Sequence, residues 1–257
     1  MTKHALHSIL VVLLVSTGMT SVVADTVTLQ QGVDGYAGAK DVWLYADAET
    51  GNLGAHRIMV TRNEEGAKNS TALVSFDLSG KVPSNATIIS ATLKLYNYSA
   101  RYDGNTTINI HRVLRDWEEG TGVSGDYSYT LGATWKFYSQ SPYDVEWDSA
   151  GALGAGDSVG TATDSVSYYG STTGSGWVSF DVTADVSGYV SESFQNYGWV
   201  LNNAFGKADQ RFYTSDHTDD PSLRPVLVVE YVPEPVAGSL MLIGSAVIMN
   251  RRKRHNR

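Results

Sequence analysis

Hydrophobic and polar residues alternate in two runs of the segment Leu73–Tyr98. Every second residue is apolar from Val74 to Leu78 and again from Ala91 to Leu95, with polar residues between them in the second run. Such alternation is typical of strands with one buried and one solvent-exposed face. The connector Gly80–Asn85 contains glycine, proline and asparagine, which favour turns. The pattern therefore predicts two strands joined as a hairpin.

A second copy of the first run follows later in the chain, because Leu73–Ser79 reads LVSFDLS and Trp177–Thr183 reads WVSFDVT. Further strands are predicted near residues 26–31, 42–45, 56–61, 106–114, 197–201, 211–215 and 224–231. Valines at positions 182, 186 and 190 recur every four residues, which predicts one short helix over the core. The fold expected from this pattern is all-β, an antiparallel β-sandwich with one short helix in a single domain.

One long irregular region, from about Arg115 to Tyr169, interrupts the strands and is rich in Gly, Ser, Tyr and Trp. A loop of this length inside a compact domain is usually functional or loosely packed. Its aromatic candidates for ligand contact are Tyr127, Tyr129, Trp135, Tyr138, Tyr143 and Trp147. Two roles stay open for them, contact with a ligand or closure of one end of the sandwich.

The N-terminus has the composition of a secretory signal peptide. Lys3 precedes an apolar run, Ile9–Val15, and the small residues of Val22-Val23-Ala24 stand where signal peptidase selects its cleavage site. We therefore expect residues 1–24 to be removed after Ala24 and the chain to be exported.

The C-terminus, residues 232–257, combines Pro233-Glu234-Pro235, an apolar segment from Val236 to Met249 and an arginine-rich end. The apolar segment has 14 residues, which as a helix reach roughly 21 Å and fall short of the ~30 Å bilayer core. This order of features resembles a PEP-CTERM sorting signal. The resemblance implies that an exosortase cuts near the triplet, that the only contact with a membrane is through this helix, and that the source is a Gram-negative-type bacterium. A plain tail anchor remains the alternative.

Charge and cysteine usage narrow the choice of partners. The chain has 19 basic and 27 acidic residues, and six of the basic and one of the acidic residues lie in the two ends. The body, residues 25–231, therefore has 13 basic and 26 acidic residues. Such a surface repels nucleic acid and anionic membranes. Because cysteine is absent, the exported domain depends on its core rather than on disulfides.

Several motifs occur in a fixed order along the body: FDLSGKVPSNATIISATLKLY, RDWEEGT, ATW, FDVTADVSGYV, NYGWVL and RPVLVVEY. Between Gly32 and Tyr231 the chain resembles the DNRLRE-domain proteins, which are grouped with carbohydrate-binding module family 96. The resemblance implies a β-sandwich of jelly-roll type that binds polysaccharide, with alginate as the best-attested class. Relatives often have arginine before the Phe-Asp pair, where this chain has Ser75. If that arginine contacts the ligand in relatives, this chain has lost the contact.

No catalytic motif stands out. The body has His56, His111 and His217 without a zinc-ligand spacing, and it lacks nucleophile-elbow, phosphate-loop and dinucleotide motifs. Glu118 and Glu119 are the obvious carboxylates for a hydrolase, but neighbours on one strand point to opposite faces. His111-Arg112 near Tyr96 and Tyr98 suits a lyase equally poorly, because neighbouring strand residues again point to opposite faces. We therefore expect no enzymatic activity.

Binding of a glycan is the favoured activity, because aromatic faces and polar groups together recognise sugars. The outward positions of the two central strands supply the candidate ligand-binding residues, which are Lys94, Tyr96, Tyr98, Asn109 and His111, with Trp135 from the long region. If the two strands line one face, these residues form a tyrosine-bearing platform. Ordinary solvent-facing positions are the alternative.

Acidic loops raise the question of a structural calcium ion, and no other cofactor is expected. Asp216, Asp219 and Asp220 cluster in one loop, and Asp34 and Asp41 flank another. Carboxylates at loop ends are suitable calcium ligands. No defined calcium-loop motif occurs, so a solvated acidic loop is the alternative.

The sequence as a whole predicts an exported, non-catalytic polysaccharide-binding protein of the cell envelope, cell surface or extracellular matrix. Signal peptidase, exosortase and a glycan, such as an acidic or alginate-like exopolymer, are its expected partners. A structural or adhesive matrix protein without a defined sugar specificity is the main alternative, and a lyase or hydrolase with a site in the long region is the third.

Overall fold

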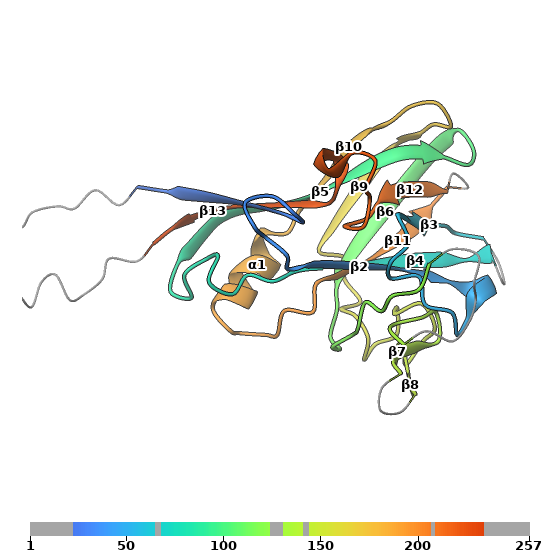
Figure 1. Ribbon diagram of the computed structural model, residues 1–257, viewed down its shortest axis with the longest axis horizontal. Helices are drawn as coiled ribbons and strands as arrows, with labels where there is room; N and C mark the ends of the chain where they lie inside the picture. Colours follow the sequence, from blue (N-terminus) through green and yellow to red (C-terminus); the bar gives the residue numbers. More distant parts are fainter. Residues whose placement is uncertain (1–22, 65–67, 124–130, 141–143, 207–208, 234–257) are drawn as a thin grey trace, which may run out of the picture.

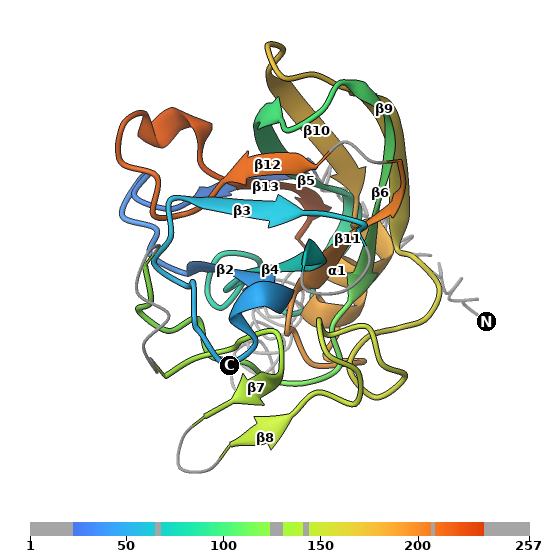
Figure 2. The ribbon, with the colours of Figure 1, turned by 90° about the vertical axis from the view of Figure 1, so that its right-hand side faces the viewer.

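The computed structural model describes residues 23–64, 68–123, 131–140, 144–206 and 209–233. In these residues the chain forms two antiparallel sheets that lie face to face (Figures 1 and 2). Sheet A has the order β1 (Asp25–Gln30), β13 (Val226–Val232), β5 (Thr87–Ala100), β12 (Gln210–Tyr213) and β3 (Ile58–Thr61), and β10 (Gly176–Asp181) also pairs with β5. Sheet B has the order β2 (Ala39–Tyr45), β4 (Ser70–Phe76), β11 (Trp199–Phe205), β6 (Gly104–Arg112) and β9 (Asp164–Gly170).

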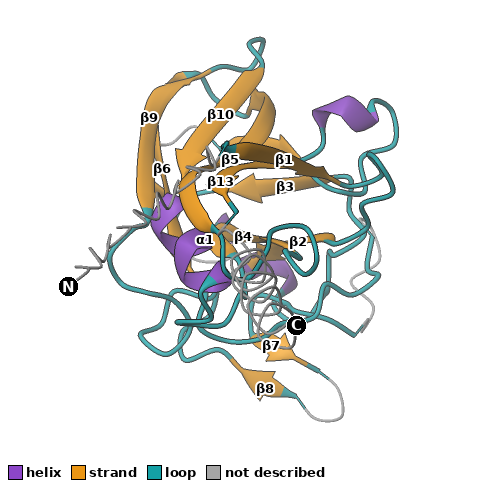
Figure 3. Ribbon diagram, turned by 90° about the vertical axis from the view of Figure 1, so that its left-hand side faces the viewer, coloured by secondary structure: helices purple, strands orange, loops and turns teal. Residues whose placement is uncertain are grey.

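Short elements complete the fold. A small hairpin pairs β7 (Phe137–Ser139) with β8 (Val145–Glu146), and two 3-10 turns span Ala46–Ala48 and Pro221–Leu223. The predicted helix is present as α1 (Thr183–Val190), which lies at one end of the sandwich (Figure 3). Val186 and Val190 of the helix pack into the core together with Val182 at its N-cap, as their spacing predicted. The prediction of an all-β sandwich with a single short helix is confirmed.

The alternation in the sequence corresponds to the two faces of each strand. In β5, Ala91, Leu93 and Leu95 are buried between the sheets, whereas Lys94 and Tyr96 on the other parity are partly exposed. The main core lies between the sheets and includes Phe76, Phe180 and Phe212, each at most 1% exposed. Burial of apolar side chains on this scale supplies the dominant stabilising free energy in a chain without disulfides.

The predicted hairpin of the two alternating runs is wrong. β4 belongs to sheet B and β5 to sheet A, so the connector Asp77–Ala86 crosses from one sheet to the other. Each of the two strands has one apolar face. Both apolar faces are buried because the strands lie on opposite sides of the same core. The periodicity of a strand fixes its buried face but does not fix its hydrogen-bonded neighbour.

The repeated motif is divided between the sheets in the same way. The first copy forms the end of β4 in sheet B, and the second copy forms β10 in sheet A. Val74 and Phe76 from the first copy, and Val178 and Phe180 from the second, are all buried in the main core. The two copies therefore contribute equivalent apolar positions from opposite sheets.

The described residues of the long irregular region pack against the outer face of sheet B and do not form a loose loop. A second buried cluster joins strand residues to aromatic and small residues of this region, and its members are Val42, Leu44, Leu73, Val113, Trp117, Ala133, Trp147, Ala152 and Val200. For this reason every residue of β4 is buried, on both of its faces.

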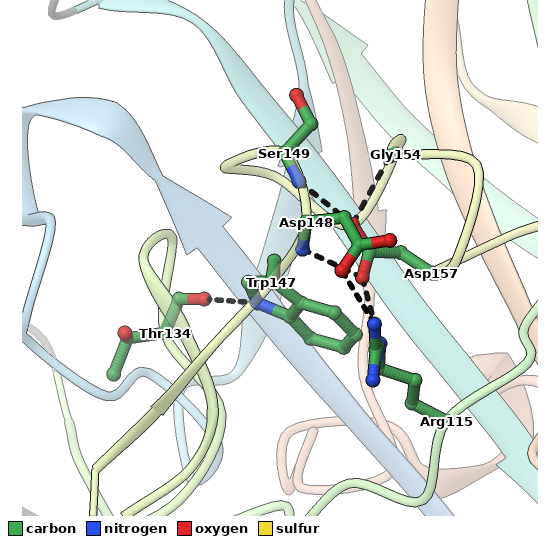
Figure 4. A network of polar contacts seen from close by, with 7 residues as sticks. All are labelled: Arg115, Thr134, Trp147, Asp148, Ser149, Gly154 and Asp157. Atoms are coloured by element: carbon green, nitrogen blue, oxygen red, sulfur yellow. Dashed lines mark hydrogen bonds and ion pairs between the residues drawn. The ribbon is translucent and has the colours of Figure 1, made fainter.

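A fully buried carboxylate, Asp157, holds this region together (Figure 4). Its Oδ1 accepts hydrogen bonds from the Asp148 backbone N–H at 2.9 Å and from Arg115 Nε at 3.0 Å. Its Oδ2 accepts bonds from the backbone N–H groups of Ser149 at 2.9 Å and Gly154 at 3.1 Å. Both carboxylate oxygens are thus satisfied, as a buried charge requires.

The two ends of the described body lie together (Figure 1). β1 pairs antiparallel with β13, so that Asp25 stands opposite Tyr231, and the Tyr231 hydroxyl donates to Asp25 Oδ2 at 3.2 Å. In the part of the chain that the structure describes, no helix has the length and hydropathy needed to cross a bilayer. Glu234, Pro235 and the apolar segment after them lie outside the described residues, as does nearly all of the predicted signal peptide.

Candidate functional site

The outer face of sheet A is open, whereas the long region covers the outer face of sheet B over β2, β4 and the start of β11. On this open face the described residues place a group of rings that we call the aromatic row. It consists of Trp177 from β10, Tyr96 and Tyr98 from β5, Tyr213 from β12 and His217 from the following loop. The row is outward-facing because the intervening residues Val178, Leu95 and Phe212 are buried in the core.

The rings of the row are in continuous contact. Trp177 meets Tyr96 edge to face, with centroids 5.3 Å apart. Tyr213 is nearly parallel to Tyr96 at 5.9 Å, with an interplanar angle of 2°, and to Tyr98 at 4.8 Å, with an angle of 8°. His217 stacks on Tyr213 at 3.6 Å. Contacts of this kind stabilise the side chains beyond the area that they bury, so the row is preorganised.

Different parts of the row offer different groups to a ligand. Trp177 is 38% exposed and presents apolar indole surface, and Lys94 Nζ lies 5.1 Å from the centre of its ring. The Tyr213 ring lies between close parallel neighbours, so its hydroxyl and ring edge are what it offers to solvent. The Tyr96 hydroxyl donates to Ser175 Oγ at 3.1 Å. The row thus combines an apolar surface with hydroxyl groups and one ammonium, the mixture that sugar recognition requires.

Both imidazoles near the row favour the neutral form. Burial is the main cause that lowers the pKa of His217, which is 4% exposed, although nearby Asp219 opposes the shift. Burial also lowers the pKa of His56, whose Nδ1 lies 2.7 Å from the Ile58 carbonyl oxygen. Burial raises the pKa of Tyr213, with the neighbouring Tyr98 as a further cause. The two imidazoles therefore act as uncharged hydrogen-bonding groups.

The structure separates the predicted platform into two parts. Lys94, Tyr96 and Tyr98 lie together on the open face of sheet A, but Asn109 and His111 lie on β6 of sheet B. Asn109 Oδ1 accepts a hydrogen bond from Ser165 Oγ at 2.7 Å, and His111 Nδ1 lies 2.9 Å from the Val159 carbonyl oxygen. The expectation of one shared face is therefore wrong, because the two strands belong to different sheets.

The aromatic residues described in the long region close the outer face of sheet B. Trp147 is 5% exposed and donates from Nε1 to the Thr134 carbonyl at 3.0 Å. Trp135 and Tyr138 pack against the same buried cluster. Of the two roles left open by the sequence, packing is the one seen for these three residues. Tyr127, Tyr129 and Tyr143 lie outside the described residues.

Sequence reasoning missed Trp177 and Tyr213 as members of a surface. Each lies next to a buried core residue of its own strand, Val178 and Phe212, so the alternation placed both on an outward face. The alternation does not show which strands pair, and it is the pairing that brings Trp177 opposite Tyr96 and β12 beside β5.

Two of the three acidic residues predicted as metal ligands, Asp219 and Asp220, have other partners. Asp219 forms an ion pair with Arg57 at 3.0 Å, and Asp220 Oδ1 accepts bonds from the backbone N–H and the hydroxyl of Ser222. Asp216 is exposed. Among the described residues, no group of three or more His, Cys, Asp and Glu side chains is arranged to hold a metal ion. A calcium ion stays a prediction for assays with added metal and chelator.

Two carboxyl groups, those of Asp41 on β2 and Glu119, are close enough to interact electrostatically. Asp41 is completely buried, and its Oδ2 accepts from the Ser215 backbone N–H at 2.7 Å, while Oδ1 has no hydrogen-bond partner in the structure. Glu119 Oε1 accepts from the Asp41 backbone N–H at 2.7 Å. Burial is the main cause that raises the pKa of Glu119 to about 7, and the same cause raises the pKa of Asp41 well above its ordinary value.

The carboxylates and side chains considered for catalysis do not converge. Glu118 is exposed, whereas Glu119 is turned towards Asp41. His111 and Arg112 lie on β6 in sheet B and are separated from Tyr96 and Tyr98 in sheet A. Trp117 is 2% exposed and packs in the second buried cluster, with Nε1 donating to the Tyr197 carbonyl at 2.8 Å.

An antiparallel β-sandwich with one open aromatic sheet face is a surface suited to carbohydrate, because aromatic rings pack on the apolar faces of sugars. Comparison with known families agrees with this class: the sequence model of carbohydrate-binding module family 96 matches residues 34–124. The match includes β2 to β6, and with them Lys94, Tyr96 and Tyr98. It supports a role in binding carbohydrate rather than in catalysis. No curated protein matches the chain.

Proposed function

We propose that this protein is an exported, non-catalytic polysaccharide-binding protein and that the aromatic row on sheet A is its glycan-binding surface. The observation that carries the proposal is the open face itself, on which Trp177, Tyr96 and Tyr213 are in contact and partly exposed. The family match supports the carbohydrate class of ligand. The ammonium of Lys94 beside Trp177 favours an acidic exopolymer, such as an alginate-like chain. This local positive charge opposes the repulsion between such a polymer and the negatively charged body.

Export and sorting complete the proposal. The signal peptide is removed after Ala24, and an exosortase acts near Pro233-Glu234-Pro235, which leaves the body in the envelope or matrix. The positions of β1 and β13 support cleavage at these two places. Ala24 is exposed immediately before β1, and Pro233 follows directly after β13. Both cuts fall outside the paired strands and leave the sandwich intact.

The test is retardation on affinity gels cast with alginate, pectin, cellulose, xylan or a neutral control, with calcium and with chelator. We expect one glycan to retard the protein, and the variant Trp177→Ala to lose at least about ten-fold in affinity, ~1.4 kcal/mol, because it removes the exposed indole. Phe205→Ala is the matched control, since Phe205 is 64% exposed but lies on β11 of sheet B.

Two results would contradict the proposal. Equal mobility of the protein in every gel excludes binding to these glycans and favours a structural matrix protein. Release of new sugar ends from the polymer during incubation contradicts the non-catalytic assignment. Retardation in the gels with calcium but not in those with chelator would show that glycan binding requires a metal ion.

A further inference from the structure

Two hollows lie at opposite ends of the aromatic row. The first, of about 380 Å³, is lined by residues of β9 and β10. These two strands are the adjacent edges of the two sheets (Figure 3). Trp177 lines this hollow together with Tyr168 and Tyr169. The second, also of about 380 Å³, lies beside β3, and Tyr98, Tyr213 and His217 line it. Each hollow therefore shares residues with the row, so the three surfaces are continuous.

The row runs across the strands rather than along them. β10 pairs with β5, β5 with β12 and β12 with β3. The register places Trp177 opposite Tyr96 and Tyr213 opposite Ile58. Four adjacent strands span three inter-strand spacings, or roughly 14 Å between the outermost strand axes. With a hollow at each end, the surface is longer than a single sugar ring.

The first hollow presents aromatic surface and hydroxyl groups. Tyr169 is 63% exposed and Trp177 is 38% exposed, so both offer apolar surface to a ligand. Ser171, Ser175 and Ser179 also line this hollow. Large exposed aromatic side chains beside hydroxyls are uncommon without a partner and mark an interaction surface.

The second hollow presents groups that donate and accept hydrogen bonds. Arg57 lines it, and its side chain is 61% exposed and paired with Asp219 at 3.0 Å. An ion pair this exposed contributes little to stability, so both partners can exchange it for ligand groups at low cost. His56 and His217, which favour the neutral form, complete the lining.

We propose that one extended glycan chain crosses the strands of sheet A, from the β9–β10 hollow past Trp177, Tyr96 and Tyr213 to the hollow at Arg57. The inference rests on the proposed function and specifies how that surface is used. Several consecutive sugar units are bound at once, Tyr169 and Arg57 contact units at opposite ends, and Trp177 contacts the chain between them.

The test measures the affinity of the full chain for size-graded oligosaccharides, from disaccharides to octasaccharides, prepared from alginate and from xylan. We expect affinity for the recognised series to rise with length until the oligosaccharide reaches both hollows. Tyr169→Ala and Arg57→Ala should each lower the affinity for the longest oligosaccharides about ten-fold and leave the affinity for the shortest detectable ones unchanged. Both side chains are exposed, so neither variant disturbs the core.

The matched control is Tyr102→Ala, because Tyr102 is 47% exposed and lines neither hollow. Equal affinity at every length, or wild-type affinity of both end variants for long oligosaccharides, overturns the inference while binding itself stands. Absence of binding at every length, with Trp177→Ala indistinguishable from the wild type, overturns the proposed function and the inference with it.

Discussion

At the scale of single residues, side chains that are neighbours in sequence have opposite environments. Trp117 is buried in the second cluster against sheet B, Glu118 is exposed, and Glu119 turns inward to the Asp41 backbone N–H. In the sequence, Glu118 and Glu119 stand out only as the obvious carboxylates for a hydrolase. The structure shows that the second of them is a half-buried carboxyl group beside a fully buried one, which costs free energy whenever both are ionised.

This arrangement predicts the sign of a pH effect. The pKa of Glu119 is raised from its ordinary 4.5 to about 7, so the folded protein binds this proton more tightly than the unfolded chain does. Its stabilising contribution is complete below about pH 4.5 and is lost as the pH rises through about 7. After solvent screening, we expect a loss of about 1–2 kcal/mol.

The measurement is urea denaturation at about pH 5 and about pH 8. Glu119→Gln mimics the protonated group, so this variant should lose about 1–2 kcal/mol less between the two pH values than the wild type. The exposed neighbour gives the control, since Glu118→Gln should follow the wild type. Identical pH dependence in all three proteins would mean that Glu119 titrates normally.

At the scale of elements, the same alternating pattern produces different surroundings in the two sheets. β4 and β10 derive from nearly the same motif, but β4 is buried on both faces and β10 alternates between buried and exposed positions. The difference comes from the long region, which covers β4 and its neighbour β2 in sheet B and leaves sheet A open. An element's own sequence therefore predicts its inward face, whereas a distant segment decides whether the other face is free.

The long region depends on Asp157 for its shape, which gives an element-scale prediction. Asp157→Asn removes the charge that accepts bonds from Arg115 Nε and from three backbone N–H groups. Since breaking a buried pair leaves unsatisfied groups, we expect a loss of about 3 kcal/mol in the free energy of unfolding.

Thermal or urea denaturation measures this loss, and Asp148→Asn is the matched control. Asp148 also pairs with Arg115, but its side chain is 48% exposed, so its substitution should cost less than about 1 kcal/mol. Similar losses in the two variants would show that Asp157 is not the group that holds the region together.

At the scale of the whole molecule, the two ends and the proposed binding surface are separated along β5. Val232, the first residue of the predicted sorting signal, pairs with Thr87 at the start of β5. Tyr96 and Tyr98 lie near the end of the same 14-residue strand, and at about 3.4 Å per residue Tyr98 is roughly 37 Å from Thr87. A body tethered through its C-terminus presents the aromatic row away from the tether.

The prediction at this scale is that the tether and the glycan act independently. A chain ending at Val232 should bind the recognised glycan within about two-fold of the full chain, because the row and both hollows are complete without the tail. Titration calorimetry on the two proteins makes the comparison. A ten-fold difference in affinity would show that the tail contributes to the glycan site.

The sequence by itself determined the class of fold, because period-two alternation requires one buried face per strand and the spacing of three valines requires one helical face. It also placed Lys94, Tyr96 and Tyr98 on an outward face. Only the tertiary structure decided which strands are neighbours. It put β4 and β5 in different sheets, removed Asn109 and His111 from the candidate surface, and brought Trp177 and Tyr213 to Tyr96. The physical reason is that alternation is a local property, whereas pairing is chosen by the burial of all the apolar faces at once.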